Sequence, residues 1–155
     1  MQISPIEEYS LRCLIQLARN SGEAPLTIRQ ISVSEGLSTA YVGKILYHLQ
    51  KVGLVQGLRG VQGGYRLVKP ADQLSLGEVF RAINPTAWSM VCEKYTGDLE
   101  ACANAGHCGL QPVWNRLAGH LYAYLDTITL EGAAREAAGG PAGWTEPSLT
   151  PAGAA

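Results

Sequence analysis

The sequence predicts a mainly α-helical fold that contains one small β-hairpin. Hydrophobic residues recur at three- and four-residue intervals along much of the first 84 residues and again from residue 110, which is the period of amphipathic helices. Between two of these helical stretches, two short β-prone segments flank the glycine-rich residues 57–64, as in a hairpin. With 155 residues, of which 46% are hydrophobic, the chain can form a core and is either one domain or one small domain with an extension.

Local signals mark where the first helices begin and end. Residues 4–7, 27–30 and 75–78 each start with Ser or Thr and carry Glu or Gln three positions later, the pattern of a capping box. A further helix is expected from Ser38 to about Gly53, because serine can cap its start and glycine commonly ends a helix. The second and third helices are joined by a tight glycine turn and are followed by the hairpin. Residues 1–84 are therefore predicted to form a winged helix-turn-helix.

The helical period is strongest in the C-terminal part of the chain, where it continues for about five turns. The apolar residues that follow it are Leu110, Val113, Trp114, Leu117, Ala118, Leu121, Leu125 and Ile128. Such a helix needs a large partner surface, so we expect residues 110–131 to be a dimerisation helix that packs against its own copy in a homodimer. Residues 85–109 show neither period and are predicted to be a loop, and the Ala-, Gly- and Pro-rich residues 132–155 a disordered tail.

Charged residues are distributed unevenly along the sequence. Residues 1–70 hold eight Lys or Arg and four Asp or Glu, whereas residues 71–155 hold four and nine. A basic amino-terminal half suits a polyanionic partner, although an excess of this size is also common on ordinary surfaces. We expect a cytoplasmic protein with reduced thiols and no membrane contact, because neither a signal peptide nor a membrane-length apolar run is visible. We expect no enzyme, since no nucleophile–base set or phosphate-binding loop is present.

The third predicted helix and the hairpin offer side chains to double-stranded DNA. Short polar residues at the start of that helix can reach base edges or phosphates, Lys44 offers a phosphate contact, and Arg59 at the hairpin tip could enter a minor groove. The alternatives are a solvated helix face in a protein-binding winged helix and an ordinary surface arginine. The predicted DNA-contacting residues are Thr27, Ser38, Thr39, Ala40, Tyr41, Lys44, Arg59 and Gly60.

Three cysteines, Cys92, Cys102 and Cys108, lie in the predicted loop of residues 85–109. Nothing in the local pattern requires them for packing, so their sulfurs are the expected reason for their presence. Gaps of nine and five residues separate them, whereas structural zinc usually uses pairs two to four residues apart. The wider gaps suit a loop around an iron–sulfur cluster, which thiolates hold. Cys13 lies beside the apolar face of the first helix and is expected to be a small buried residue instead.

Three cysteines leave one position of such a cluster for another ligand. His107 is a candidate because it is adjacent to Cys108, although neighbouring side chains tend to diverge. Glu8 is the other candidate, because Glu7 is used by the capping box and Glu8 has no such local explanation. The alternative for Glu8 is an exposed first-turn carboxylate that interacts favourably with the helix dipole.

A resemblance to one known family is carried by Tyr-Ser-Leu-Arg at 9–12, Ser-Thr-Ala-Tyr at 38–41, Lys-Val-Gly-Leu-Val at 51–55, Arg-Gly-Val-Gln-Gly-Gly-Tyr-Arg-Leu at 59–67, the three loop cysteines, and the stretch 114–130 that ends in Ile-Thr-Leu. From about Met1 to Leu130, the chain resembles the IscR/NsrR-type iron–sulfur winged-helix transcription regulators. This resemblance implies a homodimer joined through the helix from Leu110, three cysteine ligands to a 2Fe–2S or 4Fe–4S cluster, and an affinity for operator DNA that the cluster switches.

In such relatives the fourth cluster ligand is either a histidine three residues after the last cysteine or a carboxylate from the partner's first helix. Here the histidine position is Gln111 and the carboxylate position is Glu8, so the resemblance implies the three loop cysteines and Glu8 as metal ligands. Two departures leave the cluster type and the operator sequence open: the gap between the first two loop cysteines is longer than in the best-known members, and Gly43 stands where some relatives carry an acidic selector. A structural zinc or a cluster-free cysteine thiol switch is the alternative function.

Overall fold

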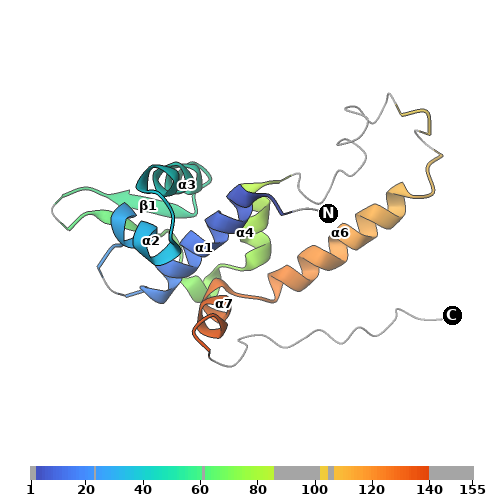
Figure 1. Ribbon diagram of the computed structural model, residues 1–155. Coiled ribbons are helices and arrows are strands. Elements are labelled where there is room, and N and C mark those ends of the chain that lie inside the picture. Colours follow the sequence, from blue (N-terminus) through green and yellow to red (C-terminus); the bar gives the residue numbers. More distant parts are fainter. Residues whose placement is uncertain (1–2, 23, 61, 86–101, 105–106, 140–155) are drawn as a thin grey trace.

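The computed structural model describes residues 3–22, 24–60, 62–85, 102–104 and 107–139. It confirms the mainly α-helical fold with one two-stranded antiparallel hairpin (Figure 1). The elements of the winged helix-turn-helix are α1 (Pro5–Arg19), α2 (Ile28–Glu35), α3 (Thr39–Lys51), β1 (Val55–Leu58), β2 (Gly64–Leu67), a 3₁₀ turn η1 (Ala71–Gln73) and α4 (Leu76–Ile83). The described part continues with α6 (Gln111–Asp126) and α7 (Leu130–Glu136).

Two of the three predicted capping boxes are complete. In residues 4–7 and 27–30 the hydroxyl accepts from the backbone three positions later, and the Glu or Gln side chain accepts from the backbone N–H of the cap. At α4 the Ser75 hydroxyl accepts a hydrogen bond from the Glu78 N–H, but the Glu78 carboxylate forms an ion pair with Lys69 instead of returning to the cap. The third box is therefore only half formed, because a cation from the end of the hairpin competes for the carboxylate.

The core lies where α1, α3, α4 and α7 meet. Leu14 of α1, Leu46 and Leu49 of α3, Val79 of α4 and Leu130 of α7 are all fully buried. Each large apolar side chain removed from water in this way stabilises the fold by about 1.5–3 kcal/mol. This core fixes the orientation of α3, whose opposite side is turned to solvent.

The hairpin is attached to the helical body, which consists of α1, α2, α3, α4 and α7, through the segment that precedes α2. Val55 pairs with Leu67, and Leu58 pairs with Gly64. Leu26 forms an additional antiparallel bridge to Tyr65, which the sequence did not predict. A Cβ atom at Gly64 would lie 2.7 Å from the Leu26 carbonyl oxygen, so this close approach of two backbones requires glycine.

The C-terminal part differs from the predicted single helix of residues 110–131 with a tail from 132. Instead, α6 ends at Asp126, and α7 begins after its N-cap Thr129 and packs against α1. The break arises where the segments before α4 and α7 exchange backbone hydrogen bonds, from Leu76 N–H to the Ile128 carbonyl and from Leu130 N–H to the Leu74 carbonyl. Small residues that suggested disorder are used for close packing here, since Gly132 and Ala134 of α7 are buried. The rest of the predicted tail, residues 140–155, lies outside the described residues.

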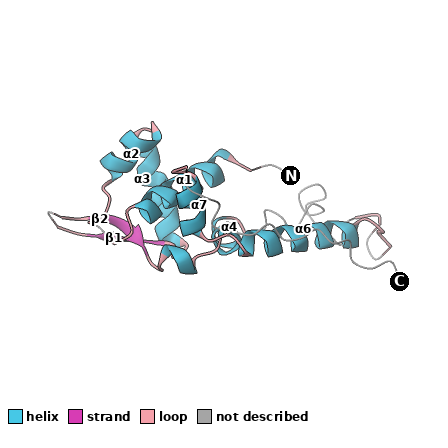
Figure 2. Ribbon diagram, turned by 90° about the horizontal axis from the view of Figure 1, so that it is seen from below, coloured by secondary structure: helices cyan, strands magenta, loops and turns pink. Residues whose placement is uncertain are grey.

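Helix α6 projects from the body on the side away from the hairpin, as Figure 2 shows. Among the described helices, none combines the length and hydrophobicity that crossing a membrane requires.

Candidate DNA-binding surface and cysteine segment

Helix α3 has one buried side and one exposed side along its whole length. Val42, Ile45, Leu46 and Leu49 are fully buried. The Ser38 hydroxyl caps the helix by accepting from the Tyr41 N–H, at a donor–acceptor distance of 3.2 Å. Of the residues predicted to contact DNA, those that are exposed on α3 and its cap are Ser38, Thr39, Ala40 and Lys44.

The Tyr41 side chain is half-buried and is held by α1. Its ring packs edge-on against Tyr9, with 5.7 Å between the ring centroids. The guanidinium of Arg12 lies 5.5 Å from the Tyr9 centroid on the same helix. The position of this part of α3 therefore depends on the first two turns of α1.

A buried carboxylate joins α1 to the end of α2. Glu35, whose side chain is only 6% exposed, accepts hydrogen bonds from Arg12 Nε at 2.6 Å and from Gln16 Nε2 at 2.5 Å. The hydrogen bond and the charge of Glu35 raise the pKa of Arg12. This clamp satisfies a carboxylate that would otherwise be costly to bury, and it fixes α2 against α1.

The tip of the hairpin presents Arg59 to solvent. Both Arg59 and Gly60 are exposed, and Gly60 has a φ of 110°, which favours glycine. A Cβ atom at Gly63 would lie 2.5 Å from the Leu58 carbonyl oxygen, so the turn is too narrow for a side chain there. Thr27, which is also predicted to contact DNA, is exposed, and its hydroxyl takes part in the capping box with Gln30.

The stretch from residue 24 to residue 68, which holds α2, α3 and the hairpin, has an excess of positive charge. It contains five Lys or Arg and a single carboxylate, Glu35. The Glu35 carboxylate is already bound by Arg12 and Gln16. The stretch therefore contains no other carboxylate that could pair with its exposed Lys and Arg side chains. Such a surface suits a polyanion.

Two of the three loop cysteines fall within the described residues. Cys102 and Cys108 are free thiols, both half-buried, in the short segment that leads into α6. Cys92 lies outside the described residues. The remaining cysteine, Cys13, is fully buried on α1, and burial raises the pKa of its thiol to about 12. Two accessible thiols fit the ligand chemistry of an iron–sulfur cluster, and the neutral core thiol does not.

The candidate fourth ligands differ in their surroundings. Glu7 is buried and accepts hydrogen bonds from the Ser4 N–H at 2.6 Å and from Asn84 Nδ2 at 2.9 Å. Glu8 is exposed on the first turn of α1, and His107 is exposed beside Cys108. Within the described part of one chain, no three His, Cys, Asp or Glu residues come close enough together to hold a metal ion. A complete ligand set would therefore need residues outside the described ranges, such as Cys92, a second subunit, or both.

Helix α6 has an apolar face that no other described part of the chain covers. None of its residues is buried, and Val113, Trp114 and Leu117 are 51%, 37% and 48% exposed. Leu110, directly before the helix, is 59% exposed. The end of α6 near the body is the part that is held.

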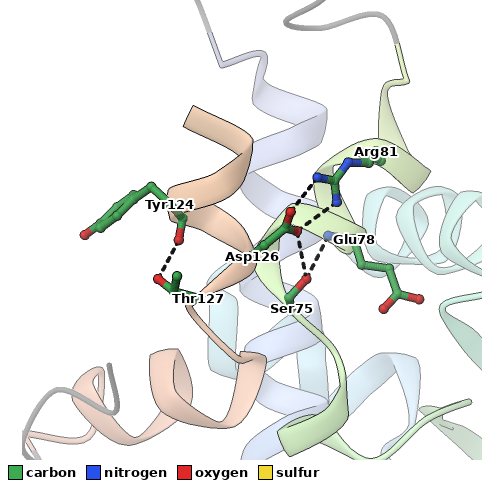
Figure 3. Close-up of polar contacts among 6 residues, drawn as sticks. All are labelled: Ser75, Glu78, Arg81, Tyr124, Asp126 and Thr127. Atoms are coloured by element: carbon green, nitrogen blue, oxygen red, sulfur yellow. Dashed lines mark hydrogen bonds and ion pairs between the residues drawn. The ribbon is translucent and has the colours of Figure 1, made fainter. Parts of the chain in front are cut away.

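A polar joint fixes that end of α6 to α4 (Figure 3). Arg81 donates two hydrogen bonds to the Asp126 carboxylate, at 2.8 and 2.6 Å, and the Ser75 hydroxyl donates a third at 3.3 Å. The Arg81 guanidinium also lies 4.5 Å from the ring centroid of Tyr122. The bond to Arg81 lowers the pKa of Asp126. A Cβ atom at Gly77 would lie 2.0 Å from Asp126 Oδ1, so the two helices meet at a glycine.

Comparison with known proteins identifies the family. The model of the Rrf2 family, described as an iron-dependent transcriptional regulator, matches residues 4–136. The chain belongs to the Rrf2 family. It is 31% identical over 130 residues to the HTH-type transcriptional regulator IscR of Cronobacter sakazakii, covering 84% of this chain and 78% of that protein. It is 27% identical over 137 residues to protein rrf2 of Nitratidesulfovibrio vulgaris, covering 88% and 89%.

Solved structures agree with this assignment. CymR, the global cysteine regulator of B. subtilis, is similar with a TM-score of 0.67 and 26% identity, over 86% of this chain and 96% of CymR. IscR of T. potens is similar with a TM-score of 0.67 and 26% identity, over 88% of each chain. The predicted family, the winged-helix fold, the role in DNA-binding transcription regulation and the absence of enzymatic activity are thereby confirmed.

In this Rrf2-family regulator, the residues that sequence reasoning missed are those of the joint between α4 and α6. Arg81 and Asp126 are 45 positions apart, so no local spacing relates them. The glycine in α4 was the only available signal, because a glycine inside a helix often marks a close approach of another element. The periodicity of α3, by contrast, correctly identified its buried side, although Tyr41, which was expected on the exposed side, is half-buried against Tyr9.

Proposed function

We propose that this regulator is a homodimer whose affinity for operator DNA is switched by an iron–sulfur cluster held by Cys92, Cys102 and Cys108. The observation that carries the proposal is the position of Cys102 and Cys108. These two half-buried thiols lie in the residues shortly before α6, a helix whose apolar face has no partner within the described chain. A ligand at this position would therefore sit beside the dimer interface.

The exposed face of α6 supports the dimer. A second copy is the occupant we infer, because the same face on two subunits can pack against itself about a two-fold axis. Burying Val113, Trp114 and Leu117 in that way removes a patch of apolar surface that a monomer would leave in water.

The donor set supports the cluster, of 2Fe–2S or 4Fe–4S type. When bound, the cluster would supply a redox-active centre that small oxidants can reach, and the relatives named IscR and the iron-dependent description of the family agree with such a centre.

We assign the fourth ligand to the Glu8 carboxylate of the partner subunit. Glu8 is exposed and has an oxygen donor available, whereas the neighbouring Glu7 carboxylate is buried against Ser4 and Asn84.

The position of Glu8 gives a route from the cluster to the DNA-binding surface. Tyr9 is the next residue and contacts Tyr41 of α3, and Arg12 one turn later holds Glu35 of α2. A bond that restrains the start of α1 would therefore restrain both helices of the helix-turn-helix. Release of Glu8 would let α1 shift and change how α3 is presented to DNA.

The decisive experiment is anaerobic purification followed by absorption spectroscopy and analysis of iron and acid-labile sulfide. Visible absorption with iron and sulfide is expected. Iron content should fall in Cys92→Ala, Cys102→Ala and Cys108→Ala, and should persist in Cys13→Ala, the matched control. Full iron content in Cys102→Ala would contradict the three-cysteine site.

A thiol switch without a cluster is the second candidate, because Cys102 and Cys108 are accessible free thiols and CymR, a cysteine regulator by its description, has the same fold. A colourless protein whose DNA affinity changes on oxidation would favour it. A colourless protein with one bound zinc ion per subunit would instead favour a structural zinc site.

A further inference from the structure

The exposed side of α3 continues well beyond the residues predicted to contact DNA. Ala40, Lys44, Tyr47 and Lys51 follow one another at intervals of four, three and four residues, so they form one ridge opposite the core. At 1.5 Å per residue this ridge is about 16 Å long. The predicted contacts occupy its first half, and Tyr47 and Lys51 occupy the second half.

Tyr47 and Lys51 form a pair on the surface of the last two turns. The Tyr47 side chain is an exposed large aromatic, with 59% of the residue accessible to solvent. The Lys51 ammonium lies 5.0 Å from the centroid of its ring. An aromatic residue left this open gains little for the core, and the cation–π contact holds a positive charge beside the phenol.

The charge around this pair favours an anionic ligand. The only carboxylate between residues 24 and 68 is Glu35, which is buried and bound by Arg12 and Gln16. Lys44, one turn before Tyr47, is a further exposed cation on the same ridge. The ridge is therefore electropositive along the length that would lie against a duplex.

We propose that Tyr47 and Lys51 bind the sugar–phosphate backbone of DNA and extend the contact of α3 past the base edges. The inference rests on the docking of α3 on DNA described above. In helix-turn-helix proteins the amino-terminal residues of the recognition helix contact base edges. The DNA duplex is curved, whereas α3 is straight. The later turns of α3 therefore lie next to the phosphates at the rim of the groove. The Lys51 ammonium pairs with a phosphodiester oxygen, the Tyr47 hydroxyl donates to another, and the ring packs on deoxyribose.

The test compares affinities for two duplexes of equal length, measured by fluorescence anisotropy over a range of salt concentrations. One duplex carries a site selected by the wild-type protein from random sequences, and the other carries that site scrambled. The variants are Lys51→Gln, Tyr47→Phe and Tyr47→Ala. Lys44→Ala tests the first half of the ridge, and Arg135→Gln on α7, which packs mainly against α1 and η1, is the control for loss of a distant cation.

Lys51→Gln should weaken binding to both duplexes by a similar factor and reduce the salt slope by about one unit. Tyr47→Phe should weaken binding about 2–10-fold through loss of the hydroxyl contact, and Tyr47→Ala should weaken it further. Arg135→Gln should match the wild type. Because Tyr47 and Lys51 are exposed, all variants should keep the wild-type circular dichroism spectrum and melting temperature.

Three outcomes would overturn the inference. If Lys51→Gln and Tyr47→Ala bind like the wild type while Lys44→Ala is weakened, α3 docks on DNA but its second half does not, and the proposed docking survives. If Tyr47→Ala loses affinity for the selected duplex alone, Tyr47 reads bases rather than the backbone. If the wild-type protein enriches no duplex from the random sequences and binds none in the anisotropy measurement, the docking itself is wrong and this inference fails with it.

Discussion

At the scale of single residues, surroundings decide which cysteines can serve as ligands. Cys13 and Cys108 are chemically identical, yet Cys13 is fully buried and Cys108 is accessible. Burial raises the pKa of the Cys13 thiol to about 12, so at neutral pH it stays protonated and unreactive. The sequence pointed to this difference because Cys13 lies on a periodic helix and the other cysteines do not.

We therefore expect Cys13 to resist alkylation in the native state. Iodoacetamide at pH 8, applied to metal-free protein, should label Cys102 and Cys108 rapidly and Cys13 only after denaturation. Peptide mass spectrometry at successive times measures the three rates. Rapid native labelling of Cys13 would show that the α1 core opens readily or that Cys13 is not buried.

Arg59 and Lys44 should contribute to DNA binding in different ways. Arg59→Ala is expected to weaken binding by about 1–3 kcal/mol and to change sequence preference, if the exposed hairpin tip enters a groove. Lys44→Ala should instead reduce the salt slope by about one unit, because it removes one phosphate contact. Titrations at several salt concentrations separate the two effects. Unchanged affinity and slope in both variants would rule out docking through the hairpin and α3.

At the scale of elements, local sequence signals predicted where helices start. The features that they did not predict, the division of the C-terminal region and the joint between α4 and α6, depend on contacts between distant segments. The caps of α1, α2 and α3 depend on residues within one turn, so they could be read directly. The division of the C-terminal region into α6 and α7 depends on backbone pairing between residues 74–76 and 128–130. No periodicity within residues 110–131 contains that information. The exposed apolar face of α6 was predicted from the sequence. The ion pair with Arg81 that holds α6 to α4 was not.

The contact of α4 with the end of α6 should be sensitive to a single methyl group. In Gly77→Ala the new Cβ would lie 2.0 Å from Asp126 Oδ1 and 3.1 Å from its backbone nitrogen. We expect destabilisation by about 1–3 kcal/mol, because this overpacking outweighs the gain in helix propensity. Urea unfolding monitored by circular dichroism measures the change.

Gly119→Ala is the matched control for that substitution. Gly119 lies in the middle of α6, is exposed, and has nothing within 4 Å of an added Cβ. This variant should be stabilised by about 0.5–1 kcal/mol. Equal effects of the two substitutions would mean that α4 and α6 do not meet closely at Gly77.

At the scale of the whole molecule, the body and the projecting α6 serve different contacts. The hairpin and α6 extend in opposite directions from the core, so an interface built on α6 leaves the hairpin and α3 free (Figure 1). The joint at Arg81 and Asp126 sets the angle between them. In a dimer joined through α6, that angle would determine the spacing of the two α3 helices and hence of the half-sites.

Leu117→Glu should therefore dissociate the dimer. It places a carboxylate on the exposed apolar face of α6, where two copies would bring like charges into a dry contact. Val33→Glu is the control, since Val33 is 77% exposed on α2, away from that face. Light scattering coupled to size-exclusion chromatography should show a monomer for the first variant and a dimer for the second. Dimers in both would place the interface elsewhere.

The identity of the fourth ligand decides how the two subunits communicate. If the partner subunit's Glu8 completes the cluster, the cluster of one subunit is bonded to α1 of the other. A shift of α1 would then reach α3 through the contact of Tyr9 with Tyr41, and α2 through the contact of Arg12 with Glu35. A carboxylate is a harder and weaker iron ligand than a thiolate, so the bond between Glu8 and the cluster should be the first that a small reactant displaces. Glu8→Ala should then shift the absorption spectrum, shorten the cluster lifetime and blunt the DNA response under anaerobic conditions. His107→Ala should leave all three close to wild type; the reverse pattern would assign the ligand to His107 and confine the switch to the cysteine segment of one subunit.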